Sequence, residues 1–133
     1  MQKTFDLEVD GLKFQCLPLP LTTRLRLDKQ LLTLLSPVAK TISTAPNELI
    51  AAVQAMPEVF QNLPDADFLQ LVSITLQTTT AITSDKGALS LAEEMNREAI
   101  FDKLTTLYKL MVEIWRQNKL TVFVLAANRS IGG

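Results

Sequence analysis

The stretch AIFDKLTTLYKLMVEIWRQNKLTVFVL, which runs from Ala99 to Leu125, decides the fold. Its part from Ile100 to Gln117 predicts one helix, because apolar residues recur every three or four positions. The apolar arc of this helix covers roughly 200°, wider than the stripe of an ordinary surface helix. The arc contains Ile100, Phe101, Leu104, Leu107, Tyr108, Leu110, Met111, Val112, Ile114 and Trp115. We therefore expect either the central helix of a small bundle or a helix that shares its apolar face between the core and another chain.

Length and composition set the class of protein. A chain of 133 residues suits a single domain, residues 1–133, and 47% hydrophobic residues supply a core. The formal net charge is −1 and no basic cluster occurs, so nucleic-acid binding is not expected. One cysteine fits a reducing compartment. No membrane partner is expected, since no run of 18 apolar residues occurs and residues 1–10 lack an apolar signal core.

Residues 3–18 predict a β-hairpin. Apolar and polar residues alternate on either side of Asp10-Gly11, a dipeptide that favours the positive φ angles of a two-residue turn. The resulting register pairs Val9 with Leu12, Leu7 with Phe14, Phe5 with Cys16 and Glu8 with Lys13. The six apolar side chains then share one face. This face must pack on helices, because an isolated hairpin is marginally stable in water.

Residues 22–125 are expected to be helical apart from one loop. Apolar periodicity and the prolines predict helices near residues 22–36, 45–57 with one more turn to 63, and 64–78. The expected fold class is therefore mainly α: a small helical bundle preceded by an N-terminal two-stranded antiparallel β-hairpin.

The remaining segments carry weaker patterns. Residues 78–91 are rich in threonine and contain Asp85 to Gly87, so they predict a flexible loop. Leu120 to Leu125 reads LTVFVL, which is compatible with a strand or with a helix. Residues 129–133 are expected to form a frayed tail.

The first predicted helix carries two charged residues inside its apolar arc. Its expected inner line consists of Leu21, Leu25, Leu32 and Leu35, with Leu27, Leu31 and Leu34 beside it. Arg24 and Asp28 are four positions apart and fall within the same arc. They are either a partly solvated pair at the edge of the arc or a charge pair at an interface. At an interface such a pair fixes register more than it adds affinity.

The chemical inventory argues against an enzyme. The chain has no histidine, which excludes Ser-His-Asp and Cys-His catalysis and any histidine-ligated metal. The single Cys16 cannot build a structural zinc site, and we expect it to be a buried, inert hydrophobe. Neither GxxxxGK[ST] nor GxGxxG occurs. We expect no catalytic residue, no cofactor and no bound metal.

Three features, in chain order, carry a family resemblance. The hairpin leads through Leu17-Pro18-Leu19-Pro20 into the leucine-rich stretch Arg24 to Leu35, and the helical middle ends in a polar loop with Gly87. The closing segment holds Phe101, Leu104, Leu107, Tyr108, Trp115, Asn118 and Phe123. In these features the chain resembles the small tail assembly chaperones of long-tailed (siphovirus-type) bacteriophages and prophages.

The resemblance implies a non-enzymatic role before the tail is complete. Such chaperones are thought to coat the long, aggregation-prone tape measure protein and to recruit tail tube subunits, and many are also made in a longer, frameshifted form. It implies a homo-oligomer in the host bacterial cytoplasm that is absent from the mature virion. Weak apolar contacts, repeated along a helix and linked by avidity, would suit this role.

The candidate protein-interface residues come from the helical wheels. They are Arg24, Asp28, Tyr108, Met111, Trp115 and Phe123. A second reading remains open, in which the chain is a small structural or adaptor subunit, such as a minor tail protein or a regulatory protein-binding module. Its apolar helix face would then be a stable interface instead of a reusable one.

Overall fold

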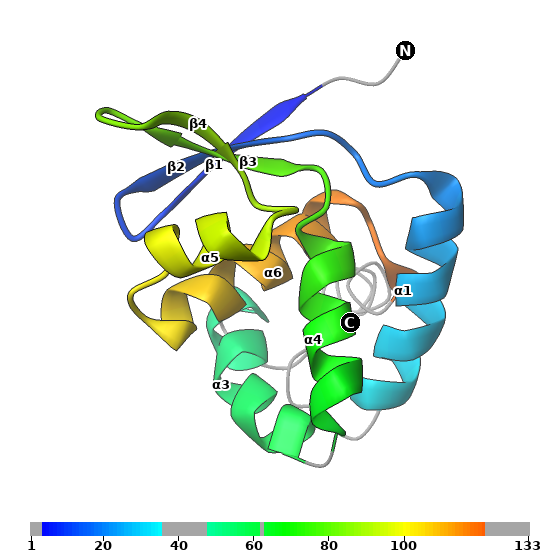
Figure 1. Ribbon diagram of the computed structural model, residues 1–133. Coiled ribbons are helices and arrows are strands. Elements are labelled where there is room, and N and C mark those ends of the chain that lie inside the picture. Colours follow the sequence, from blue (N-terminus) through cyan, green and yellow to red (C-terminus); the bar gives the residue numbers. More distant parts are fainter. Residues whose placement is uncertain (1–3, 36–47, 62, 122–133) are drawn as a thin grey trace.

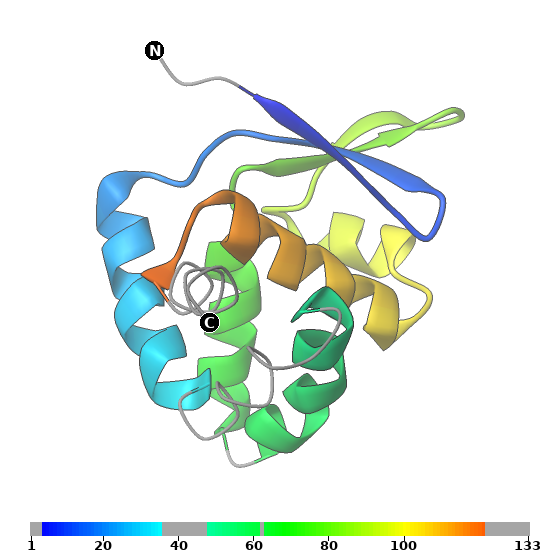
Figure 2. The same ribbon diagram turned by 180° about the vertical axis from the view of Figure 1, so that it is seen from behind.

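The computed structural model describes residues 4–35, 48–61 and 63–121, which form five helices and four strands (Figure 1). In chain order they are β1 (Phe5–Val9), β2 (Leu12–Cys16), α1 (Leu21–Leu35), α3 (Glu48–Gln61), α4 (Asp65–Thr75), β3 (Thr79–Thr83), β4 (Gly87–Ser90), α5 (Glu94–Ile100) and α6 (Leu104–Gln117). The strands form one sheet that lies across one side of the helical part, as Figure 1 and Figure 2 both show.

The hairpin of β1 and β2 has the predicted register. The two strands are antiparallel and Val9 lies opposite Leu12, next to the turn. Asp10 and Gly11 have φ angles of 51° and 82°, which a two-residue turn of this type requires. The apolar side chains of both strands are buried or half-buried, and the polar ones between them are exposed. The prediction of this hairpin is therefore confirmed.

The expected fold class is wrong, because the strands are not limited to an N-terminal hairpin. Residues 78–91, which we expected to form a flexible loop, contain β3 and β4. The four strands form a single antiparallel sheet in the order β1-β2-β3-β4. Cys16 of β2 lies opposite Thr79 of β3, so the edge of the hairpin is paired within the chain. The protein thus combines a helical part with a four-stranded sheet.

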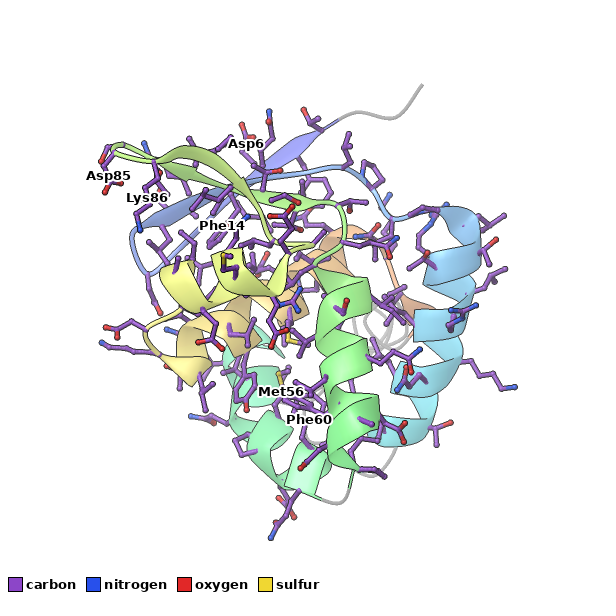
Figure 3. All side chains as sticks on the ribbon, in the orientation of Figure 1. Asp6, Phe14, Met56, Phe60, Asp85 and Lys86 are labelled. Atoms are coloured by element: carbon purple, nitrogen blue, oxygen red, sulfur yellow. The ribbon has the colours of Figure 1, made fainter. Side chains whose placement is uncertain are left out.

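The threonine-rich segment forms a strand because its side chains alternate between two environments. Thr79 and Ala81 are each 1% exposed and face the core, whereas Ile82 is 45% exposed on the outer face. The β-branched side chain of threonine favours an extended backbone. Asp85 lies at the tip of the hairpin (Figure 3), where Gly87 closes the turn with a φ of 72°. The prediction gave more weight to the polarity of this segment than to its β-propensity.

The central helix of the fold is α6, which contacts α3, α4 and β1. Leu110 and Met111 are fully buried on its inner side. Met56 and Phe60 project from α3 into the space between α3 and α4 (Figure 3), and both are buried. The first of the two alternatives for the wide apolar arc, a central helix, thus describes α6.

The helix predicted from Ile100 to Gln117 begins later than expected, at Leu104, and a separate helix α5 precedes it. The helix α5 ends at Ile100, and Phe101 has an extended backbone with φ −94° and ψ 104°. The ring of Phe101 stacks on that of Phe14 in the sheet, with 6.1 Å between centroids and 11° between planes. Residues 101–103 are not helical and separate α5 from α6. As a result Leu104, expected on the buried line, is 67% exposed at the start of α6.

The helix α1 packs through one edge of its predicted apolar arc instead of through the centre of the expected inner line. Its buried leucines are Leu27, Leu31 and Leu35, while Leu21, Leu25 and Leu32 of the expected inner line are exposed. The leucines of this helix span about half of its circumference. Periodicity alone therefore could not decide which edge of the broad arc meets the core.

Two further predictions concern the helices and the ends of the chain. The helix α3 continues through Pro57 to Gln61, so the proline does not end it. Most of the Leu120 to Leu125 run and the tail of residues 129–133 lie outside the described residues.

Candidate protein-binding surface

The predicted interface residues Met111 and Trp115 lie in the core. Both side chains are 0% exposed. The indole N–H of Trp115 donates a buried hydrogen bond to Oγ1 of Thr75, with 3.0 Å between the two atoms. This bond joins α6 to α4. The apolar surface of both residues is covered within the chain, and the hypothesis that they contact another chain stays a prediction.

Tyr108 lies at the edge of the core and is half-buried. Its ring centroid is 5.9 Å from that of Phe60 and 6.5 Å from that of Phe68. The rings of Phe60 and Phe68 are themselves 4.8 Å apart. The three aromatic side chains join α3, α4 and α6 by tilted and edge-on contacts, which are favourable arrangements for aromatic pairs.

Arg24 and Asp28 do not form an ion pair with each other; among the described residues the ion pairs are Lys109–Asp10 and Arg116–Glu113. The carboxylate of Asp28 accepts two hydrogen bonds from Thr121, one from the backbone N–H (2.6 Å) and one from Oγ1 (2.9 Å). Asp28 therefore ties α1 to the chain after α6. Phe123 lies outside the described residues.

A groove of about 250 Å³ lies between α4, α5 and the beginning of α6. Apolar side chains form most of its lining: Phe68, Leu69, Val72, Phe101, Leu104 and Leu107. Leu69 and Leu104 are 62% and 67% exposed. Sequence reasoning missed this groove because it continued one helix through residues 101–103. Lys103, which interrupts the apolar arc, was the signal that could have located the break.

Acidic side chains line the side of the groove that α5 forms. Glu94 and Glu98 are exposed, and neither belongs to an ion pair of the described residues. Arg97 also lines the groove, but its Nη1 donates hydrogen bonds to the carbonyl oxygens of Leu91 (2.9 Å) and Ala92 (3.3 Å). We call this surface, with Leu69 and Leu104, the acidic groove.

A second exposed apolar surface runs along α1. Leu21, Leu25 and Leu32 are 63%, 62% and 37% exposed, and their spacing places them on one line of the helix. We call these three residues the leucine stripe. Lys29 follows Leu25 by four positions and is exposed beside the stripe, with Arg26 further around the same side. The sequence had placed these leucines in the core.

Asp10, in the turn of the first hairpin, forms a hydrogen bond and an ion pair with residues of α6. The carboxylate of Asp10 accepts hydrogen bonds from Oγ1 of Thr106 (2.6 Å) and from Nζ of Lys109 (2.9 Å). These two hydrogen bonds lower the pKa of Asp10 below its ordinary value of 3.8, and the bond from Thr106 has the larger effect. The pair holds the sheet against the central helix.

The described residues do not bring metal-ligating side chains together. They contain no group of three or more Cys, Asp or Glu side chains that could hold a metal ion. Burial raises the pKa of the Cys16 thiol, and its Sγ accepts a hydrogen bond from Thr79 at 3.6 Å. Within the same part of the chain, no helix has the length and apolar character needed to cross a membrane.

Exposed apolar surfaces on a small domain that combines helices with a sheet are typical of protein-binding modules. A family model described as "Phage tail assembly chaperone protein, TAC" matches residues 10–125. The chain therefore belongs to this family of phage tail assembly chaperones, and the resemblance of the sequence to them is confirmed. The comparisons with curated proteins and with solved structures found no match.

Proposed function

We propose that this chain is a non-enzymatic tail assembly chaperone that binds the tape measure protein and recruits tail tube subunits during tail morphogenesis. The observation that carries this proposal is the family match over residues 10–125. The exposed leucines of α1, α4 and α6 support it, because apolar side chains on helices are what an extended helical client contacts.

Several copies of the chain act together on one client. A tape measure protein offers a long series of apolar helical segments, and each copy contributes a modest affinity. Linked copies raise the effective concentration of every further contact, so the whole coat is held by avidity. The homo-oligomer works in the host bacterial cytoplasm and leaves before the virion is complete, without a cofactor, nucleic acid or membrane as partner.

Co-expression with the tape measure protein of the same phage tests this function. The expected result is a soluble complex that contains several copies of the chaperone per client, from a client that is insoluble when expressed alone. Light scattering after size exclusion gives the mass of the complex. Purified tail tube protein is then added, and it should join this complex but not the chaperone alone.

Two outcomes would overturn the proposal. A chain that stays free while the client remains insoluble is not its chaperone. A stable complex of fixed stoichiometry that remains in purified tails would instead make the chain a structural or adaptor subunit.

A further inference from the structure

The acidic groove and the leucine stripe are complementary in both shape and charge. The groove is a concave surface with two exposed carboxylates, Glu94 and Glu98, against one arginine that backbone carbonyls hold. The stripe is a convex row of exposed leucines on a helix with three cationic residues, Arg24, Arg26 and Lys29, and one carboxylate, Asp28.

The two surfaces lie on different sides of the molecule, so one copy cannot join its own stripe to its own groove. In Figure 1 α1 lies on one side of α4 and α5 on the other, and Figure 2 shows the same separation from behind. The helix α1 is also fixed in place, since Leu27 and Leu31 are fully buried and Asp28 is bonded to Thr121.

We propose that the acidic groove of one copy receives the leucine stripe of a second copy. Leucine side chains of the incoming α1 enter between Leu69 and Leu104. Apolar surface of both copies is then buried away from water. Lys29 and Arg26 then approach Glu94 and Glu98, which have no ion-pair partner among the described residues of their own chain. Complementary charge sets the orientation of such a contact more than its strength.

This contact is heterologous, because it joins two different patches. Every copy that offers its groove still carries a free stripe, so association continues into a ring or an open array. The groove and the stripe would be the contact surfaces of the homo-oligomer in the proposed function. Only the role of this oligomer rests on the proposed function. Self-association can be measured without any client.

Charge exchange tests the contact in the full chain. Sedimentation velocity over a range of concentrations compares wild type with a groove variant, Glu94→Lys with Glu98→Lys, and a stripe variant, Arg26→Glu with Lys29→Glu. Each variant should raise the dissociation constant by about tenfold or more, since two exposed pairs become repulsive. The chain with all four substitutions should return to within a few-fold of wild type, because the pairs re-form with opposite sign.

The control is Lys86→Glu, which changes a charge at the exposed tip of the β3–β4 hairpin (Figure 3) and should leave association unchanged. Circular dichroism checks that all variants stay folded. A wild type that is monomeric at all concentrations would overturn the inference. So would a chain with all four substitutions that associates no more tightly than the groove variant or the stripe variant. If the groove variant binds the tape measure protein less well without any change in self-association, the groove holds the client instead.

Discussion

The side chain of Asn118 joins the end of α6 to the segment between β2 and α1. Its Oδ1 accepts a hydrogen bond from the backbone N–H of Leu19 (2.9 Å), and its Nδ2 donates to the carbonyl of Ile114 (2.8 Å). Asn118 is 7% exposed and Leu19 is 0% exposed, so water cannot readily replace these bonds. The asparagine that the sequence places on the apolar line of the helix therefore ends the helix and binds a second segment of the same chain.

Asn118→Ala should lower the free energy of unfolding by about 1–3 kcal/mol, because it leaves the N–H of Leu19 buried without an acceptor. Urea denaturation followed by circular dichroism measures the change. Gln117→Ala is the matched control: Gln117 is the exposed neighbour, and its truncation should change stability by less than about 0.5 kcal/mol. Equal effects at the two positions would mean that the bond to Leu19 does not contribute.

The contact of Asp10 with Thr106 and Lys109 makes stability depend on pH. The pKa of Asp10 in the folded state lies below its unfolded value, because the ionised form accepts the two hydrogen bonds. Its contribution is therefore fully present above the unfolded pKa, about 4, and is lost as the pH falls through the folded pKa.

Asp10→Asn should reduce the loss of stability between about pH 5 and pH 2, since asparagine has no carboxyl to protonate. Asparagine tolerates the positive φ of 51° at this position, so the turn is retained. Urea midpoints at several pH values give the profile. Asp85→Asn removes an equal charge from the β3–β4 turn without touching α6, and it should keep the steeper wild-type profile. The same profile in both variants would contradict the assignment to Asp10.

The place of Trp115 in the core predicts what a charge there will do. Trp115→Glu removes a fully buried side chain, a loss of about 3–5 kcal/mol in packing alone, and adds a carboxylate that nothing neutralises. We expect the variant to lose its cooperative unfolding transition, measured by circular dichroism on heating. A variant that stays folded but forms a smaller species would instead support the sequence-based hypothesis of an interface at Trp115.

At the scale of elements, local chemistry determined what the sequence could predict. The register of β1 and β2 follows from alternation around Asp10-Gly11, which are adjacent in sequence. The pairing of β2 with β3 joins residues more than sixty positions apart, such as Cys16 and Thr79, and no local pattern specifies it. The residues of β3 pair with the neighbouring strand β4 as well as with β2, and only the pairing with β4 is local in sequence.

The same limit explains the missed groove. The helical period continues through residues 101–103 with Lys103 as its one interruption, so a wheel alone does not show that the helix breaks there. At the break the ring of Phe101 stacks on that of Phe14, a residue far away in the sequence that no local pattern can supply. Of the six predicted interface residues, the five that are described are divided between the core and α1, because a wheel gives the apolar face of a helix but not the packing partner.

Hydrogen exchange tests the second hairpin as an element. β3 has partner strands on both sides, so the amides of Thr79 to Thr83 should exchange slowly, at rates close to those of global unfolding. The amides of the exposed turn residues Ser84 and Asp85 should exchange fast. Amide exchange resolved by NMR measures both. Fast exchange throughout residues 79–83 would restore the flexible loop that the sequence predicts.

At the scale of the whole molecule, the heterologous contact makes each copy a connector with one groove and one stripe. Leu25 and Leu104 are 62% and 67% exposed, so an aspartate at either position should leave the monomer folded while blocking one of its two surfaces. Leu25→Asp keeps a functional groove, and Leu104→Asp keeps a functional stripe. Each variant alone should therefore remain a monomer.

An equimolar mixture of the two variants should form a dimer and nothing larger. The intact groove of Leu25→Asp receives the intact stripe of Leu104→Asp, and both free ends of this dimer are then blocked. Sedimentation velocity separates monomer, dimer and longer species, and circular dichroism confirms that both variants are folded. Dimers in either variant alone, or longer species in the mixture, would contradict a single head-to-tail contact. A mixture that stops at the dimer, beside a wild type that continues to associate, is the behaviour expected of a chain whose copies line up along an extended client.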